Sequence, residues 1–361
     1  MSTTDTTSGP GSATTTVVPQ GMTEKRLPRW APLAVTAAAL VVALLVTLPG
    51  KTTVAGVAVI TALLAVAGTW LLSLVVEGGR QATDRLVTAL VTVAFLIAMV
   101  PLVSVVWTVV EQGAARLDAD FFTWSMRGVV GEGGGALHAI WGTVLVTVAT
   151  TIISVPIGLL TAIYLVEYGR GRLARAITFF VDVMTGIPSI VAGLFAIAAF
   201  TLILGPRVRF GIIGAVALSV LMIPVVVRSC EEMLKLVPNE LREASYALGV
   251  PKWRTIVKVV LRTSIGGIAT GVTLAVARVT GETAPLLVTV GSTVGTNFDL
   301  FSGRMATLPV FSYFSYTQPG VPPEFSIDRA WTAALVLIAL VMALNLVARL
   351  ISYFFAPKAG R

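Results

Sequence analysis

Eight long runs of apolar residues alternate with polar segments along the chain. A helix needs roughly 20 residues to cross about 30 Å of hydrocarbon, and it satisfies its own backbone hydrogen bonds inside lipid. The predicted membrane helices are residues 31–48, 54–76, 86–110, 138–166, 176–204, 210–227, 266–290 and 331–355. Pro156 and Pro188 fall inside two of these spans, where a proline is expected to kink the helix. The pattern predicts an all-α transmembrane fold, a polytopic helical bundle of about eight helices.

The segment before the first apolar run has a different composition. Residues 1–30 are rich in Thr, Ser, Gly and Pro and show no apolar period, which predicts a disordered tail. Three basic residues, Lys25, Arg26 and Arg29, precede the first run, and a second run follows it directly. We therefore expect a retained helix rather than a cleaved signal peptide, within a transmembrane hairpin formed by residues 31–85.

Composition and charge agree with a membrane protein. Hydrophobic residues make up 56% of the chain and charged residues 12%, whereas about a quarter of the residues are charged in soluble domains. With a cytoplasmic N-terminus, 18 of the 26 lysines and arginines lie in cytoplasmic segments, 7 lie outside, and Arg278 lies within a helix. The positive-inside rule then predicts that both termini are cytoplasmic. Because the basic residues are spread over many short loops, no nucleic-acid partner is expected.

Residue types for catalysis or metal binding are scarce. One cysteine, Cys230, and one histidine, His138, exclude an intrachain disulfide and argue against a zinc or iron site. An intramembrane enzyme, the alternative class, would need paired catalytic carboxylates, a Ser/His arrangement or a metal set, and the sequence shows none of these. The Gly-Lys-Thr at residues 50–52 lacks the glycine that a phosphate-binding loop requires five positions earlier. We expect a transport protein without enzyme activity or a cofactor of its own.

The longest loop predicted on the cytoplasmic side, residues 228–265, contains a short helix. Asn239 can cap its start, Glu240 suits the positive end of the helix dipole, and Gly249 followed by Pro251 predicts its end. The apolar positions on one face are Leu241, Ala244 or Ser245, and Leu248. This face either rests against its own bundle or enters a groove on a partner.

Within this loop, Glu243-Ala244-Ser245 is followed by Gly249 six positions after the glutamate. This spacing resembles the EAA motif of binding-protein-dependent ABC importer permeases. The resemblance implies a coupling helix that docks in a cleft of a cytoplasmic ATPase, with these four residues as the coupling site. Val259 and Arg262 depart from the general motif, which commonly has isoleucine and proline at these positions.

Further stretches resemble the PstA-type permeases of phosphate importers. They are Gly-Gly-Gly at 133–135 and the stretches at 162–170, 186–194, 233–238 and 277–287, the last of which contains Gly-Glu-Thr-Ala-Pro-Leu-Leu. The resemblance runs from about residue 86 to the C-terminus. It implies a type I ABC importer permease core of six helices in residues 86–361, and it leaves the hairpin of residues 31–85 as an addition.

Several partners follow from the resemblance rather than from composition. It implies a second, similar permease subunit, two copies of a cytoplasmic ATPase that use ATP, membrane lipid around the bundle, and an extracytoplasmic phosphate-binding protein. The aromatic-rich segment 291–329 is either an interfacial hairpin or part of the docking surface for that binding protein. Import of another oxyanion, such as molybdate or sulfate, remains the alternative function.

Two charges, Arg278 and Glu282, lie four residues apart inside the predicted span 266–290, with Thr283 beside them. Each charge costs about 2.5 to 3.5 kcal/mol at the centre of a membrane helix. They either form a structural ion pair or, as the phosphate resemblance implies, belong to the substrate pathway. We expect Arg278, Glu282 and Thr283 to line that pathway.

Overall fold

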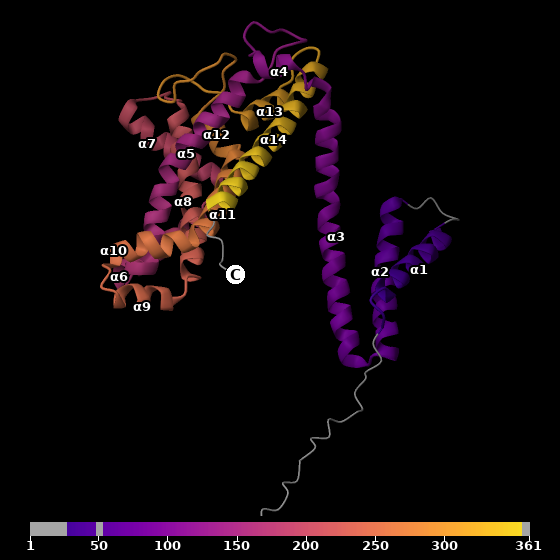
Figure 1. Cartoon of the computed structure of the whole chain (residues 1–361). Helices are drawn as coiled ribbons and strands as arrows, with labels where there is room; N and C mark the ends of the chain where they lie inside the picture. The colour runs from indigo at the N-terminus through magenta and orange to yellow at the C-terminus, as the bar shows by residue number, and fades with distance from the viewer. Residues whose placement is uncertain (1–26, 48–52, 356–361) are drawn as a thin grey trace, which may run out of the picture. The chain divides into compact units, whose positions relative to one another are not determined.

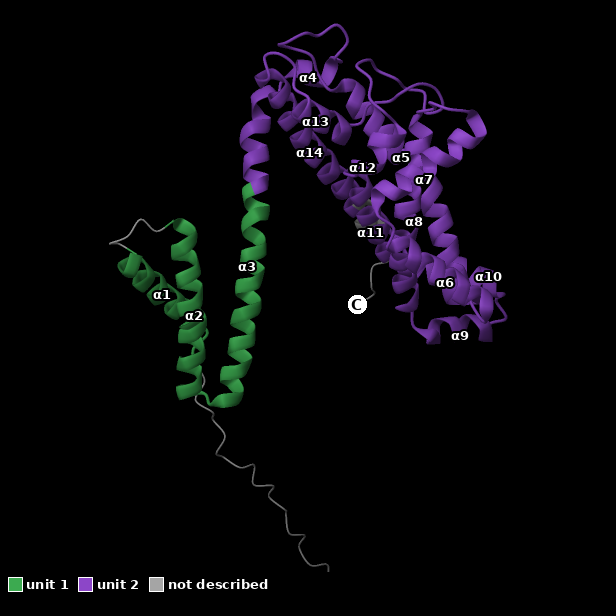
Figure 2. Cartoon of the chain, turned by 180° about the vertical axis from the view of Figure 1, so that it is seen from behind, with its two compact units in different colours: residues 1–104 green, residues 105–361 purple. Residues whose placement is uncertain are grey.

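The computed structural model describes residues 27–47 and 53–355 of the chain, and within these ranges all regular structure is helical (Figure 1). The described residues divide into two compact units, 1–104 and 105–361 (Figure 2). Most of the predicted disordered tail, residues 1–26, lies outside the described residues. The boundary expected at residues 85 and 86 between an extra hairpin and a permease domain stays a prediction.

Fourteen α-helices are found in the described ranges. They are α1 (Ala31–Thr47), α2 (Val54–Val76), α3 (Gly79–Gly113), α4 (Ala119–Thr123), α5 (Leu137–Ile163), α6 (Arg172–Thr185), α7 (Ser189–Leu204), α8 (Gly211–Lys235), α9 (Asn239–Ala247), α10 (Lys252–Thr255), α11 (Leu261–Thr280), α12 (Ala284–Thr289), α13 (Leu308–Thr317) and α14 (Glu324–Phe355). A π-helical turn, Tyr164–Tyr168, extends α5, and another, Ile256–Val260, joins α10 to α11. A 3₁₀ turn, Ala114–Arg116, follows α3.

The predicted transmembrane bundle is confirmed. Six of the described helices are long and apolar enough to cross a membrane: Val54–Val76, Gly79–Arg116, Leu137–Tyr168, Gly211–Lys235, Lys252–Thr280 and Glu324–Val347. The bent pair α6 and α7 is a seventh candidate span, and the 17 residues of α1 form a shorter apolar helix.

The two helices of the N-terminal hairpin pack through small side chains. Ala39, Ala43 and Thr47 repeat every four residues on α1, and Ala65, Thr69 and Ser73 do so on α2; all six are buried. Small residues at this spacing let two membrane helices approach closely, and the larger leucines and valines are left exposed for lipid.

Glu77 joins the ends of this hairpin. Its carboxylate accepts hydrogen bonds from Arg85 Nε at 2.5 Å, from Arg85 Nη2 at 2.7 Å, from Ser73 Oγ at 2.7 Å and from Leu27 N at 2.6 Å. These bonds, chiefly those from Arg85, hold the pKa of the Glu77 carboxyl at about 2. The carboxylate is therefore charged at any physiological pH, and it fixes the turn between α2 and α3.

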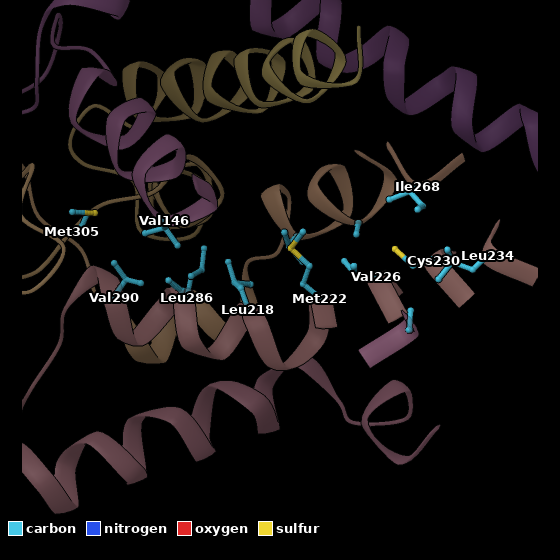
Figure 3. Packing of buried hydrophobic residues seen from close by; sticks show 14 of the residues in the cluster. Val146, Leu218, Met222, Val226, Cys230, Leu234, Ile268, Leu286, Val290 and Met305 are labelled. Atoms are coloured by element: carbon cyan, nitrogen blue, oxygen red, sulfur yellow. The ribbon is translucent and has the colours of Figure 1, made fainter. Parts of the chain in front are cut away.

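Helix α8 is the centre of the second unit. Leu218, Met222, Val226, Cys230 and Leu234 repeat every four residues along it and are all at most 1% exposed (Figure 3). Helices α5, α6, α7, α11 and α12 pack against it. The approach of α5 is close, because a Cβ at Gly158 would stand 2.7 Å from Val226 Cγ1. Helix α8 also continues to Lys235, two turns beyond the predicted end at residue 227.

The continuous helix predicted at residues 176–204 is wrong. Helix α6 ends at Thr185, α7 begins at Ser189, and the two axes differ by 109°. Pro188 lies in the break with ψ at 136°, outside the helical region. A proline disfavours the helical conformation of the residue before it, here Ile187, and Gly186 supports the end of α6. The expected kink at Pro188 is thus a complete interruption, whereas Pro156 lies within the continuous α5.

The span predicted at residues 266–290 is also divided. Helix α11 ends at Thr280 and α12 begins at Ala284, with residues 281–283 between them. Pro285 explains the break, because its ring has no N–H to donate and would clash with the carbonyl of Gly281 in a continuous helix. A proline is tolerated in the first turn of a new helix, which is where α12 places it.

Candidate functional site

The predicted coupling helix is present as α9 and ends at Gly249 as expected. Gly249 has φ of +73°, its N–H donates to Tyr246 O at 2.9 Å, and the N–H of Val250 donates to Ser245 O at 3.2 Å. These two bonds form a Schellman motif, which stops a helix with a residue in the left-handed region. The N-cap position is Pro238 and not the predicted Asn239, whose Oδ1 instead accepts a bond from Arg242.

The apolar face of α9 points away from the rest of the second unit. Leu241 is 42% exposed and Leu248 is 83% exposed, and Ala244 is exposed between them. Ser245 and Arg242 occupy the inner face instead. The interpretation in which the apolar face rests against its own bundle is therefore wrong, and Glu243, Ala244 and Gly249 are all accessible to a partner.

Arg242 fastens α9 to two other helices. Its guanidinium donates to Glu167 Oε1 from Nε at 3.1 Å and from Nη2 at 2.9 Å, and it also donates to Leu234 O and Val237 O at the end of α8. The Arg242 side chain is 13% exposed and the Glu167 side chain is 5% exposed. The pair is largely removed from water. Removing one partner of such a buried charge pair costs several kcal/mol.

Glu167 lies in the π-helical turn that ends α5, and a second set of contacts surrounds it. Lys252 Nζ donates to the Glu167 carbonyl oxygen and lies 4.5 Å from the centroid of the Tyr168 ring. Ser245 Oγ and Thr255 Oγ1 are 2.8 Å apart and buried, which joins α9 to α10. Ser245, one of the four residues predicted to form the coupling site, is therefore buried and holds α9 against α10.

A separate ion-pair network joins α6 to α8. Arg228 bonds to Asp182 of α6 and, at 2.9 Å, to Glu231 one turn further along α8. Glu231 also accepts a bond from Lys235 at 2.7 Å. Charged side chains thus hold together the ends of five helices, α5, α6, α8, α9 and α10. These contacts fix the position of α9 relative to its neighbours.

At the opposite end of the unit, two arginines hold the glycine-rich loop. Arg329 is buried and donates to Gly131 O at 2.8 Å and to Gly133 O at 3.0 Å. Arg116 donates to Gly134 O at 3.0 Å. In the Gly-Gly-Gly stretch, the carbonyl groups of Gly133 and Gly134 therefore accept hydrogen bonds from guanidinium groups, which fixes the shape of the loop.

The residues predicted to line the substrate pathway lie at the break between α11 and α12. Arg278 is exposed in the last turn of α11, whereas Glu282 and Thr283 are half-buried in the segment that follows. No carboxylate of the described residues lies within ion-pair distance of Arg278, so it does not pair with Glu282 inside this chain as the structural alternative required. Glu282 N donates to Val279 O at 3.2 Å, which places the carboxylate at the end of α11 rather than in the middle of a helix.

Sequence reasoning missed Glu167 and Arg242 as partners. They are 75 residues apart, and a local sequence pattern does not pair residues at that separation. One signal was available: Glu167 is a carboxylate directly after a long apolar run, in a stretch that resembles the permease family.

Comparison with known proteins agrees with this geometry. A family described as "Binding-protein-dependent transport system inner membrane component" matches residues 154–361. The PstA 1 phosphate transport system permease protein of Mycobacterium tuberculosis is 46% identical over 278 residues, covering 76% of this chain and 90% of that protein. PstA of Mycobacterium leprae is 47% identical over 272 residues, with 74% and 88% coverage. PstA of Pasteurella multocida is 38% identical over 283 residues, with 78% and 97% coverage.

Solved structures show the same fold at low identity. A bacterial alginate ABC transporter in complex with an alginate pentasaccharide-bound periplasmic protein matches with a TM-score of 0.55 and 13% identity, covering 77% of this chain and 97% of that chain. The MetNI methionine ABC transporter in an inward-facing conformation matches with a TM-score of 0.50 and 21% identity, covering 61% and 96%. With the family match over residues 154–361 and identities of 38 to 47% to the PstA proteins, the chain belongs to the binding-protein-dependent transport system inner membrane components and, among them, to the PstA-type phosphate transport permeases.

Proposed function

We propose that this chain forms half of the membrane pathway of an ATP-driven phosphate importer. By family it is a multi-pass, non-catalytic membrane subunit. A second, similar permease completes the pathway, two copies of a cytoplasmic ATPase supply the energy, and an extracytoplasmic binding protein delivers phosphate. The observation that carries the proposal is α9, a short helix whose apolar face is exposed while its inner face is fixed by Arg242 and Ser245.

Coupling follows from the way α9 is mounted. ATP binding and hydrolysis close and open the ATPase pair, and α9 moves with the surface on which Glu243, Ala244 and Gly249 dock. Because Arg242 links α9 to Glu167 and to the end of α8, this movement reaches α5 and α8 together. Those two helices then rock the rest of the bundle between outward and inward access.

The anion is guided by Arg278, Glu282 and Thr283. Arg278 is exposed in the last turn of α11 and has no acidic partner among the residues that the structure describes, so its guanidinium is free to contact phosphate oxygens in a bidentate fork. The break between α11 and α12 leaves backbone N–H and C=O groups without helical partners. Irregular backbone is tolerated at membrane depth only where it contacts protein or lines a cavity. Glu282 is close to Arg278 in sequence and limits how tightly the anion is held. Conduction requires that the anion be bound weakly enough to leave.

Uptake by cells that lack this chain tests the proposal. We expect phosphate uptake to fail in the deletion strain and to return when the chain is supplied on a plasmid. Labelled sulfate and molybdate provide the matched comparison in the same cells. Restored sulfate or molybdate uptake without phosphate uptake would assign the chain to another oxyanion importer.

The orientation of the chain in the membrane is a separate prediction. We expect α9 and both termini in the cytoplasm, and the segments 111–137 and 291–330 outside. A cysteine in place of Leu248, which is 83% exposed, should resist a membrane-impermeant maleimide in intact cells, whereas one in place of Val130, which is 93% exposed, should react. Both variants are made with Cys230 replaced by alanine. Labelling of position 248 from the outside would reverse the topology.

A substitution at Gly249 tests the docking of α9. A side chain in the left-handed region costs about 1 to 2 kcal/mol, most for β-branched residues, while asparagine is tolerated there. We expect Gly249→Val to lower phosphate uptake by roughly 5- to 30-fold at equal membrane levels, and Gly249→Asn to lower it less. A Cβ at this position meets no atom within 4 Å, so a clash inside the chain does not explain a loss. Normal uptake by Gly249→Val would remove the coupling assignment.

A further inference from the structure

Two arginine side chains converge over Gly291. This glycine is buried, has φ of +79° and follows α12. A Cβ built on it would lie 3.3 Å from Arg209 Cδ and 3.3 Å from Arg304 Cδ, so the two Cδ atoms are no farther apart than twice that distance. Both arginines are exposed. The stems of two exposed arginine side chains therefore meet at one small area of surface.

The backbone beneath the two arginines is fixed by hydrogen bonds. Asn297 Nδ2 donates to Ser302 O at 2.7 Å and to Arg304 O at 3.1 Å, which shapes the loop that carries Arg304. The N–H of Met305 donates to Val290 O at 3.3 Å and joins this loop to the end of α12. The N–H of Ile212 donates to Leu300 O at 2.8 Å and joins it to the start of α8, beside Arg209. The pair is thus held by the loop that follows α12 and by the start of α8, which are about 80 residues apart in sequence.

Among the residues that the structure describes, no acidic group balances the two charges. Neither arginine forms an ion pair with a carboxylate in the described ranges 27–47 and 53–355. The carboxylate nearest to Arg304 in sequence, Asp299, accepts the backbone N–H of Phe301 at 2.8 Å instead. Two like charges on neighbouring side chains repel each other. A divalent anion between them attracts both, so the electrostatic interaction of the three groups becomes favourable. A tetrahedral oxyanion also offers the oxygen pairs that guanidinium forks bind.

We propose that Arg209 and Arg304 form an oxyanion site that receives phosphate at the outer entrance of the pathway, an inference that rests on the proposed function. Arg209 lies just before α8, and the 25 residues of α8 separate it from the α9 end by about 37 Å, one membrane thickness. Gly291 and Thr283 flank the six residues of α12, which span about 9 Å. The site is therefore one short helix away from the segment assigned to Arg278 and Glu282.

The test uses the assembled transporter, with its second permease and ATPase, in phosphatidylcholine vesicles that are supplied with ATP. Uptake of inorganic phosphate is measured against the concentration of phosphate-loaded binding protein. For the double variant Arg209→Gln/Arg304→Gln we expect the maximal rate to fall about tenfold or more, because charged hydrogen bonds to the anion are lost, with an unchanged half-saturating concentration of binding protein. The double lysine variant should recover part of the rate. Arg207→Gln, on the same loop and also exposed, is the matched control and should equal wild type.

Three results would overturn the site. An increase in the half-saturating concentration with an unchanged maximal rate would make the arginines a docking contact for the binding protein. A defect seen only in vesicles that contain phosphatidylglycerol would assign the pair to a lipid phosphate. A double variant equal to wild type would leave the arginines without a role. Wild-type phosphate uptake in the same vesicles separates these results from a failure of the proposed function, which would abolish uptake in every sample.

Discussion

Replacing Arg278 with alanine should lower phosphate uptake by roughly 10- to 100-fold while the transporter still assembles. The estimate follows from the loss of charge-assisted hydrogen bonds to the anion, each worth about 1.5 to 3 kcal/mol. Arg278 is exposed and forms no ion pair with the described residues, so its removal leaves no buried carboxylate unpaired within this chain. Uptake of radiolabelled phosphate is compared at matched levels of purified complex.

Two further variants separate transport from assembly at this site. Arg278→Lys keeps the charge but loses the planar fork, and we expect an intermediate rate. Glu282→Gln should change uptake more than it changes the amount of assembled complex. If Arg278→Ala instead transports normally, Arg278 is not a pathway residue. If the complex falls apart in proportion to the lost uptake, Arg278 is a contact between subunits.

The second large effect is expected at Arg242. Arg242→Ala removes every bond that fixes α9 to Glu167 and to the end of α8, and it leaves the Glu167 carboxylate, 5% exposed, without its partner. Removing one partner of a buried pair costs about 3 to 5 kcal/mol. We expect ATP-driven uptake to fall roughly a hundredfold or more, and ATP hydrolysis to lose its stimulation by the loaded binding protein.

A double-mutant cycle distinguishes loss of the pair from general damage. Glu167→Gln combined with Arg242→Gln leaves no buried charge, so the double variant should be less impaired than the sum of the two single variants. Lys235→Ala is the control, because Lys235 is 61% exposed and its pair with Glu231 is worth about 1 kcal/mol or less. Additive losses, or a loss in Lys235→Ala as large as in Arg242→Ala, would contradict the link between α9 and α5.

Apolar length was sufficient to predict most of the membrane helices. The span predicted at 54–76 matches α2, and the π-helical end of α5 lies within two residues of the predicted end at 166. The end of α9 was also accessible, because glycine followed two residues later by proline carries its own conformational restriction. Signals of this kind depend on a few neighbouring residues only, so the folded protein shows the conformation that they predict.

The two breaks in the membrane helices were not predicted, although a proline lies within the first, at Pro188, and directly after the second, at Pro285. Apolar composition continues through Pro188 and Pro285, and composition alone does not separate a kink from an interruption. Contacts decide between them: a Cβ at Gly193 of α7 would lie 2.7 Å from Pro285 Cα, so the two interrupted segments pack on each other. The pair Glu167 and Arg242 was missed for a similar reason, since its partners meet only after α5, α8 and α9 have folded together.

The short α7 has a consequence for the surrounding lipid. Its 16 residues span about 24 Å, less than the roughly 30 Å of a typical hydrocarbon layer, whereas the 32 residues of Leu137–Tyr168 span about 48 Å. A bilayer thins around a short segment, and a long helix tilts to hide its excess length. Lipid acyl-chain length therefore changes the energy of bilayer deformation around this protein. A rocking motion that alters the tilt of the long helix must also deform the surrounding bilayer.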